Sequence, residues 1–226
     1  MPARLSDRAR SDLWLLGLAL AGGVLDATSY ISLGRVFTAN MTGNTVLLAI
    51  AVARGSGADA ARSAVALGGF SVGAAVGVML IASNIDPWPA RAGGARLLEL
   101  AALGALLVLW AVLGVAAIRY LLIAVAGSVM GLQSAAVRAS DIRGVNTTYM
   151  TSTLLNAIAR LVERVRRSPV GQDGPSLPGA AWLTYGLGAL AAAVAVPSWQ
   201  AGIVAVPLAI VAIVTVAGRV QRNEVT

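Results

Sequence analysis

Asp26 is an acidic residue set deep inside a long apolar run of the sequence. It lies 13 residues into the run Leu13–Leu33, which is about 20 Å along a helix at 1.5 Å per residue. A carboxylate near the middle of a membrane costs about 2.5–3.5 kcal/mol on insertion scales. Such residues usually serve a function, so Asp26 is a candidate proton- or cation-coupling group or substrate contact. The structural alternative is a buried ion pair or a cap on a neighbouring helix end.

A set of polar residues and a glycine stands immediately before a short apolar run, Thr45–Ala53. At the start of a half-helix, free N–H groups and the positive end of the helix dipole can bind a ligand, and a glycine allows close approach. The same side chains would also be needed if they only capped and packed a broken helix. Both interpretations stay open. The residues are Asn40, Thr42, Gly43 and Asn44.

The second half of the sequence carries a counterpart set of polar residues. Thr151 and Thr153 stand at the start of another short segment, and Gln133 and Arg138 stand at the end of the segment before it. Arg138 could neutralise Asp26 if the two halves pack about a pseudo-twofold axis. Charges at such positions are also common as interfacial anchors. A separate acid, Glu99, lies near the start of its segment, and we expect it to reach the membrane interface.

The composition is typical of an integral membrane protein. The chain has 226 residues, 58% hydrophobic and 12% charged, against about 25% charged in a typical soluble domain. It has no Cys, His or Lys, which excludes thiol and imidazole catalysis, a Ser/Lys dyad and the usual zinc sites. We expect no enzyme, no cofactor and no metal. The net charge of +7 comes from Arg at segment ends, where the positive-inside rule places it, so we expect no nucleic-acid binding.

The elements that must position these residues are eight apolar segments, in an order of long, short, long and long that occurs twice. The short segments cannot span a hydrocarbon core of about 30 Å without burying their polar residues. The first four segments are Leu13–Leu33, Met41–Ala53, Ala64–Ser83 and Leu97–Ala117, and the second four are Leu121–Val137, Met150–Leu161, Ala180–Trp199 and Ala201–Gly218.

The two halves also match by residue, which predicts an internal repeat. The segment "AGGVLDATS" (Ala21–Ser29) aligns with "AGSVMGLQS" (Ala126–Ser134), and this alignment sets Asp26 against Gly131. If the short segments cross fully, the repeats are parallel. If they are half-helices, the repeats are inverted and the half-helices enter from opposite sides. On length and polarity we favour an all-α integral membrane protein of two repeats, with about six full transmembrane helices and two short broken or half-helices.

Both topologies place both termini in the cytoplasm, because the richest arginine clusters then lie inside. The expected organisation is a cytoplasmic segment at 1–12, repeat 1 at 13–117, repeat 2 at 118–218 with a cytoplasmic loop at 162–179, and a cytoplasmic tail at 219–226.

Several blocks of the sequence resemble the YoaK-type family of bacterial multispan membrane proteins of unknown function. The resemblance covers most of the chain and implies a bacterial inner-membrane protein, but it supplies no substrate. The blocks are "GGVLDATSYISLGRVFTANMTGNTVLL" (22–48), "ALGGFSVGAAVG" (Ala66–Gly77), "MGLQSAAVR" (Met130–Arg138) and "TTYMTSTL" (Thr147–Leu154).

The sequence therefore favours a small secondary transporter or channel for an unidentified small solute or ion, with its site between the repeats near Asp26. The alternative is a membrane scaffold or assembly protein without transport activity. A cavity from Asp26 to one face would favour transport, and a filled repeat interface would favour the scaffold. The expected partners are the lipid bilayer and the solute or ion, and a homo-oligomer stays open.

Overall fold

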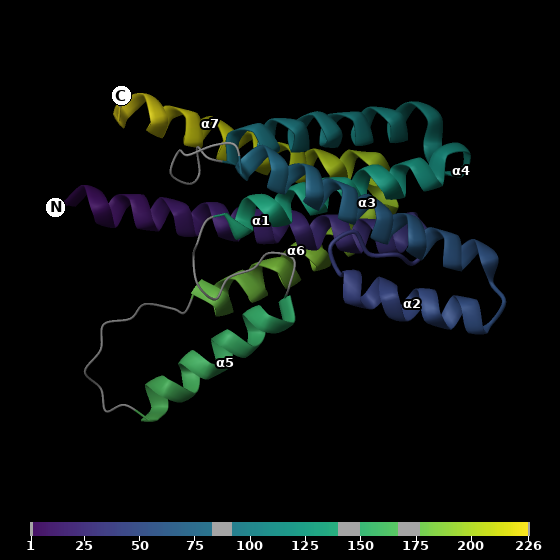
Figure 1. The fold of residues 1–226 in the computed structure, drawn as a ribbon, viewed down its shortest axis with the longest axis horizontal. Helices are drawn as coiled ribbons and strands as arrows, with labels where there is room; N and C mark the ends of the chain where they lie inside the picture. The colour runs from purple at the N-terminus through teal and green to yellow at the C-terminus, as the bar shows by residue number, and fades with distance from the viewer. Residues whose placement is uncertain (1, 83–91, 140–149, 167–176, 226) are drawn as a thin grey trace.

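A computed structural model shows an all-helical protein and describes residues 2–82, 92–139, 150–166 and 177–225 (Figure 1). The all-α class expected from the sequence is confirmed for these residues. They form α1 (Pro2–Ser32), α2 (Met41–Ala53), α3 (Gly57–Ala82), α4 (Gly93–Arg138), α5 (Met150–Arg166), α6 (Leu177–Trp199), the 3₁₀ helix η2 (Gln200–Val204) and α7 (Ala205–Val225).

Four stretches of the described residues are long and apolar enough to cross a membrane. They are α1 from Ala9 onward, α3, α4, and the continuous stretch of α6 to α7 that ends at Ala217. By contrast, α2 is apolar but has 13 residues, about 20 Å of helix, which is shorter than a hydrocarbon core of about 30 Å. The predicted short segment at Met41–Ala53 is thus confirmed at both ends.

The 46 residues of α4 do not run in one direction. Backbone angles leave the helical region at Gly114 (φ 71°, ψ 164°) and at Ile118 (φ −132°, ψ 26°). Figure 1 shows the chain folding back at this point. The combination of φ 71° and ψ 164° at Gly114 is open essentially only to glycine, because a Cβ would clash with the backbone. We call residues 93–113 the first arm and residues 119–138 the second arm; they correspond to two separate segments of the sequence prediction.

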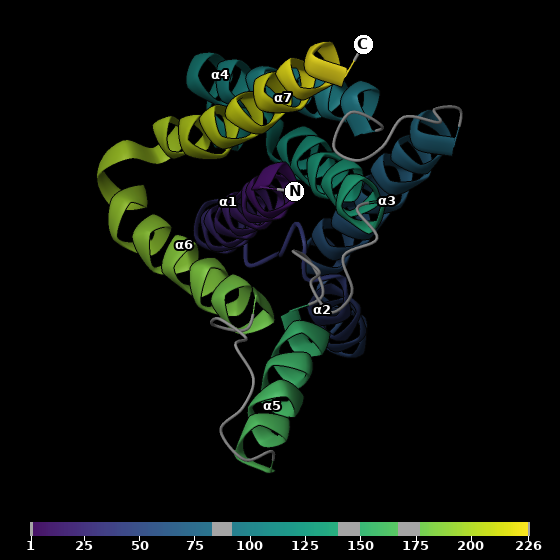
Figure 2. The same cartoon turned by 90° about the vertical axis from the view of Figure 1, so that its left-hand side faces the viewer.

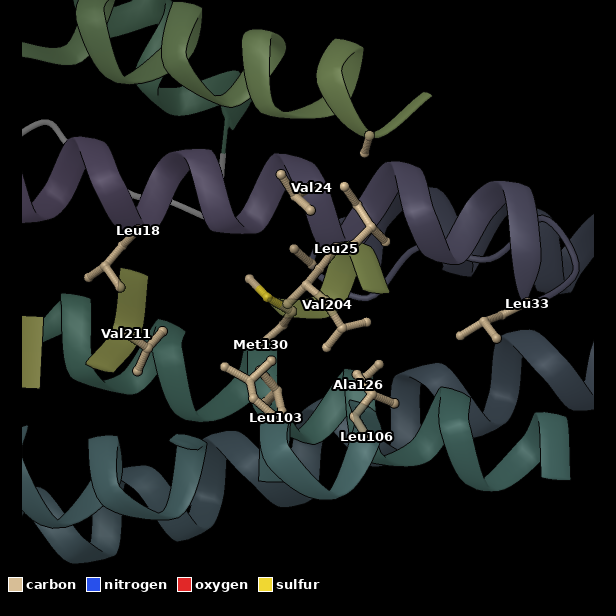
Figure 3. Close-up of a cluster of buried hydrophobic side chains, with 14 of the residues drawn as sticks. Leu18, Val24, Leu25, Leu33, Leu103, Leu106, Ala126, Met130, Val204 and Val211 are labelled. Atoms are coloured by element: carbon tan, nitrogen blue, oxygen red, sulfur yellow. The ribbon is translucent and has the colours of Figure 1, made fainter. Parts of the chain in front are cut away.

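Viewed along the bundle, α1 lies near the centre, with α6 on one side and α3 with the second arm of α4 on the other (Figure 2). The most extensive interfaces join α1 to α6 and α3 to α4. The apolar core between these helices is built from Leu, Val, Ala and Met side chains (Figure 3). Its members include Leu18, Val24 and Leu25 of α1, Leu103, Leu106, Ala126 and Met130 of α4, Val204 of η2 and Val211 of α7.

Glycines allow the two main interfaces to approach backbone to backbone. A Cβ built at Gly23 of α1 would collide with the Tyr185 carbonyl oxygen of α6. On the other side of the bundle, a Cβ at Gly131 of the second arm would collide with the Phe70 carbonyl oxygen of α3 and lie 2.5 Å from the Ala74 nitrogen. Small residues serve this purpose in membranes, where lipid supplies little hydrophobic drive for helix association.

Several helices extend beyond the apolar runs from which they were predicted. The helix α1 begins at Pro2 rather than at Leu13, and α3 begins at Gly57 rather than at Ala64. The predicted loop 162–179 is also shorter, because α5 continues to Arg166 and α6 begins at Leu177. Hydropathy marks only the part of a helix inside lipid, whereas backbone hydrogen bonds continue into water. Residues 167–176 of this loop lie outside the described residues.

The expectation that Glu99 reaches the membrane interface is wrong. Its side chain is fully buried, and Arg96, three residues earlier on the same helix face, is only 1% exposed. The two charges interact electrostatically. The start of the first arm is packed inside the protein, as the buried Ala92 and Ala95 also show. A position close to a segment end therefore did not place Glu99 near water.

Candidate functional site

The turn that follows α1 sends the chain back toward the centre of the bundle. The helix ends at Ser32 and is followed by Gly34, with φ 101°, and by Arg35, which also has a positive φ of 61°. The Arg35 N–H donates to the Tyr30 carbonyl oxygen at 3.0 Å, which is the six-residue bond that closes many helix ends. The rings of Tyr30 and Phe37 then stack with centroids 5.1 Å apart. The returning segment, residues 33–40, reaches the level of Asp26.

Asp26 is bound by the backbone of this returning segment. Its Oδ1 atom accepts hydrogen bonds from the N–H groups of Thr38 and Ala39, both at 2.6 Å, and from the Thr38 hydroxyl at 3.1 Å. The Asp26 side chain is 2% exposed and Thr38 is fully buried. Backbone N–H groups that are buried must find an acceptor, and the carboxylate supplies it. Asp26 therefore fixes the position at which α2 begins.

The second carboxylate oxygen of Asp26 faces a helix from the other half of the chain. The Tyr185 hydroxyl of α6 donates to Oδ2 at 2.6 Å, across 159 residues of sequence. The sequence analysis did not single out Tyr185. The available signal was a phenol inside the apolar segment Ala180–Trp199, because a buried tyrosine hydroxyl usually needs a polar partner. That signal indicates a partner without identifying which one.

Asn44 clamps the returning segment from the α2 side. Its Nδ2 donates to the Phe37 carbonyl oxygen at 2.6 Å, and its Oδ1 accepts from the Phe37 N–H at 2.9 Å. Asn44 is fully buried. Phe37 directly precedes Thr38, so the amide of Asn44 and the carboxylate of Asp26 hold three consecutive residues from two sides.

Asn40 and Gly43 form the start of α2. Asn40 is the N-cap residue, and its side-chain oxygen accepts from the Gly43 N–H at 3.0 Å. A Cβ on Gly43 would lie 3.0–3.2 Å from the Asn40 side chain and the Phe37 ring, so the glycine fits a tight space. Thr42 is exposed. In this part of the site the polar residues predicted from the sequence mainly cap and clamp their own backbone.

The remaining predicted site residues are not brought to Asp26. Gln133 is fully buried on the second arm of α4, and its Nε2 donates to the Leu18 carbonyl oxygen of α1 at 3.0 Å. Arg138 is exposed at the end of α4 and is not among the donors to Asp26. The predicted neutralisation of Asp26 by Arg138 is therefore wrong in this conformation, because neutral donors take its place. On α5, Thr153 is buried and Thr151 is exposed.

Chemically, the site is a buried carboxylate surrounded by two backbone amides and two hydroxyl groups. Such an arrangement can stabilise negative charge through hydrogen bonds, and it can also take up a proton or a small cation if the donors move. Within the described residues, no group of three or more His, Cys, Asp or Glu side chains is placed to hold a metal ion.

Comparison with known proteins relates the sequence to one family. Residues 14–217 match the family described as a protein of unknown function (DUF1275). The chain is also similar to the UPF0700 transmembrane protein YoaK of Bacillus subtilis (strain 168), with 31% identity over 199 residues, which cover 86% of this chain and 88% of the relative. No solved structure gives a significant match.

Proposed function

Because the chain belongs to the DUF1275 family of transmembrane proteins, for which no function is known, we propose its function from the site itself. We propose a small secondary transporter or channel for an unidentified small solute or ion, with the site between two repeats near Asp26. The family resemblance inferred from the sequence is confirmed by the match. The membrane location is shared with the bacterial relative, and we further propose the bacterial inner membrane for this chain.

The observation that carries this proposal is the placement of the two short helices. The helix α2 begins beside Asp26, which lies six residues before the end of α1, and runs toward the end where α1 stops (Figure 1). The helix α5 runs toward the opposite end, where both termini lie (Figure 1). Non-helical backbone at membrane depth is tolerated only where protein buries it or a watery cavity borders it. Half-helices that start at the midplane are common in transporters, where their ends border the substrate site.

The helix interfaces support the inverted repeat. In the first half the first long helix is α1, and it packs on α6, the third segment of the second half. In the second half the first long helix is the second arm of α4, and it packs on α3, the third segment of the first half. The short helices instead pack within their own halves, and they do so in matching ways, because α2 packs on α3 and α5 packs on α6. With reversals in α4 and between α6 and α7, this gives about six crossings of a core of about 30 Å. Both termini are then cytoplasmic by the positive-inside rule.

Asp26→Asn tests the proposal, because the amide can keep every contact of the carboxylate. The amide oxygen can accept the three bonds now made by Oδ1. The amide nitrogen can donate to the Tyr185 hydroxyl, which can accept as well as donate. The fold should persist while the titratable group is lost. The experiment reconstitutes wild type and Asp26→Asn in vesicles and measures dissipation of imposed H⁺, Na⁺ and K⁺ gradients, alongside thermal unfolding in detergent.

We expect wild type to dissipate at least one gradient faster than empty vesicles and Asp26→Asn to lose this activity at unchanged unfolding temperature. Flux equal to that of empty vesicles would remove ion-coupled transport from consideration. Equal flux by both proteins would remove Asp26 from the site.

The second candidate is a membrane scaffold or assembly protein, and one observation favours it. Asp26 is 2% exposed and both its oxygens are already bound within the chain, so this interface is filled in the present conformation. A scaffold predicts no flux from either protein and a stability that depends on the contacts of Asp26. Under both candidates we propose a non-enzymatic role, because the chain has no Cys or Lys to act as a nucleophile and no His to act as a general base.

A further inference from the structure

A cluster of arginines surrounds two adjoining pockets at the end of the bundle where α1 stops. One pocket, of about 380 Å³, lies between the turn after α1, the end of α2 and the start of α3. The second pocket, of about 520 Å³, lies beside the reversal of α4. Arg62 of α3 borders both pockets. The arginines are Arg35, Arg54 and Arg62 in the first pocket and Arg119 in the second.

A single acidic residue, Asp59, borders these pockets, and its carboxylate is already bound. It forms an ion pair with Arg62 and accepts a hydrogen bond from the Ser56 hydroxyl at 2.6 Å. It also attracts Arg35 electrostatically. Taken together, the linings of the two pockets carry four guanidinium groups and one carboxylate, which leaves an excess charge of three. Like charges that line the same pocket repel each other, and an anion between them would offset this repulsion.

The guanidinium groups also have unused hydrogen-bonding capacity. The Nε atoms of Arg62 and Arg119 are buried and have no hydrogen-bond partner among the described residues. The Arg62 side chain is held in place, because it lies directly over Gly34, where a Cβ would stand 2.7 Å from its Cδ and Nε atoms. A buried donor without a partner is destabilising, more so when the group is charged, so an acceptor is expected there.

The position of the cluster adds to the argument. On the topology proposed above, this end faces away from the cytoplasm, where the positive-inside rule places few arginines. We propose that the four arginines form an oxyanion site, the arginine vestibule, which binds a phosphate-type group. Arginine forks suit this geometry, because two parallel N–H donors match two oxygens of one anion. The group belongs either to a free anion or to the headgroup of an anionic lipid. The site stands whether or not Asp26 supports transport.

The experiment measures binding of inorganic phosphate to the full-length protein in an uncharged detergent, at constant ionic strength with chloride. Thermal unfolding is followed as phosphate is added. The test variant is Arg54→Gln with Arg119→Gln, which leaves Arg62 and its contacts in place. The control is Arg138→Gln, an exposed arginine at the opposite end of the bundle. A second variant, Asp59→Asn, removes the competing carboxylate.

Wild type and the Arg138 control should show the same phosphate-dependent rise in unfolding temperature. The double variant should bind about tenfold or more weakly, because two charge-assisted contacts are lost. Asp59→Asn should bind more tightly than wild type, each variant being compared with its own phosphate-free unfolding temperature. This opposite direction separates anion binding from general damage to the fold.

A parallel series in nanodiscs distinguishes the two sources of the phosphate group. It compares phosphatidylcholine alone with phosphatidylcholine that contains phosphatidylglycerol. Stabilisation by inorganic phosphate in detergent supports a free anion as the ligand. Stabilisation by phosphatidylglycerol alone, lost in the double variant, supports a lipid headgroup. Equal responses of wild type and the double variant to both probes would overturn the site.

Discussion

The sequence alignment of the two halves sets Asp26 against Gly131, and these two residues close their helix interfaces in opposite ways. Asp26 of α1 reaches across to α6 through its carboxylate and the Tyr185 hydroxyl. Gly131 of α4 has no side chain and lets the second arm touch the backbone of α3 at Phe70. The same helix-on-helix packing therefore serves two purposes. At the interface of α1 with α6, the packing is combined with the Asp26 hydrogen bonds, a polar link that also holds the returning segment. At the interface of the second arm with α3, the packing at Gly131 is close contact between backbones.

The largest expected effect follows from removing the polar link. Asp26→Ala leaves the buried N–H groups of Thr38 and Ala39 and the Tyr185 hydroxyl without their acceptor. At about 1–3 kcal/mol for each of these three unsatisfied groups, the free energy of unfolding should fall by at least about 3 kcal/mol. The measurement is SDS-induced unfolding in mixed micelles, with Asp26→Asn as the control that keeps the contacts. If the alanine and asparagine variants are equally stable, the returning segment is held by something other than Asp26.

Gly131→Ala tests the other side of the comparison. The new Cβ would collide with the Phe70 carbonyl oxygen, so α3 and the second arm of α4 must move apart. Overpacking of this kind costs about 2–3 kcal/mol, measured by the same unfolding titration. The matched control is Gly68→Ala in α3, where no atom lies within 4 Å of the added Cβ. This control should be neutral or more stable by up to about 1 kcal/mol through helix propensity. Equal behaviour of the two variants would contradict backbone contact at Gly131.

Asn44→Ala sharpens the comparison within the first half. The change removes two hydrogen bonds to Phe37 and should cost about 2 kcal/mol. Its specific signature is faster hydrogen exchange at the Thr38 and Ala39 amides, because the returning segment loses one of its two clamps. The exposed Thr42 provides the control, since Thr42→Ala should change the unfolding free energy by less than about 0.5 kcal/mol. Unchanged exchange at both amides would show that Asp26 alone is sufficient.

Tyr185→Phe gives the smallest expected change. One hydrogen bond to Asp26 is lost while the three bonds to Oδ1 remain, so the cost should be about 1 kcal/mol. Tyr120→Phe is the control, because Tyr120 is 44% exposed. A loss as large as that of Asp26→Ala would mean that the contact between the two halves, rather than the returning segment, dominates the link.

The features that could be predicted from the sequence are those encoded locally. The length of the apolar run and the polar Asn40 located the short helix at Met41–Ala53 to the residue. The depth of Asp26 in its apolar run indicated that it must be buried against protein, and it is. The end of α2 follows the same local logic, since Gly55 has φ 66° and the Ser56 N–H bonds the Ala51 carbonyl oxygen to close the helix.

The features that could not be predicted depend on contacts between distant segments. Tyr185 reaches Asp26 only through the packing of α6 on α1, which no periodicity in either helix specifies. The burial of Glu99 depends on how the first arm packs, and its distance from the segment end misled the prediction. The role of Asn44 was open for another reason. An amide that clamps backbone and an amide that binds a ligand need the same residue type, and only the two hydrogen bonds to Phe37 distinguish them.

The two oxygens of the Asp26 carboxylate accept hydrogen bonds from donors at very different distances along the chain. This difference has a consequence for how the protein folds while it is being synthesised. The donors to Oδ1 lie 12 and 13 residues further along the chain, so they leave the ribosome almost together with Asp26. The donor to Oδ2 lies 159 residues away, and at about 5–20 residues per second it is made on the order of ten to thirty seconds later. During that interval α1 and α2 can leave the insertion machinery as a hairpin whose acid is already bound on one side. The second arm of α4 is made earlier and contacts α3 and α1, so the arrival of α6 satisfies the second oxygen and completes the contact between the two halves of the protein.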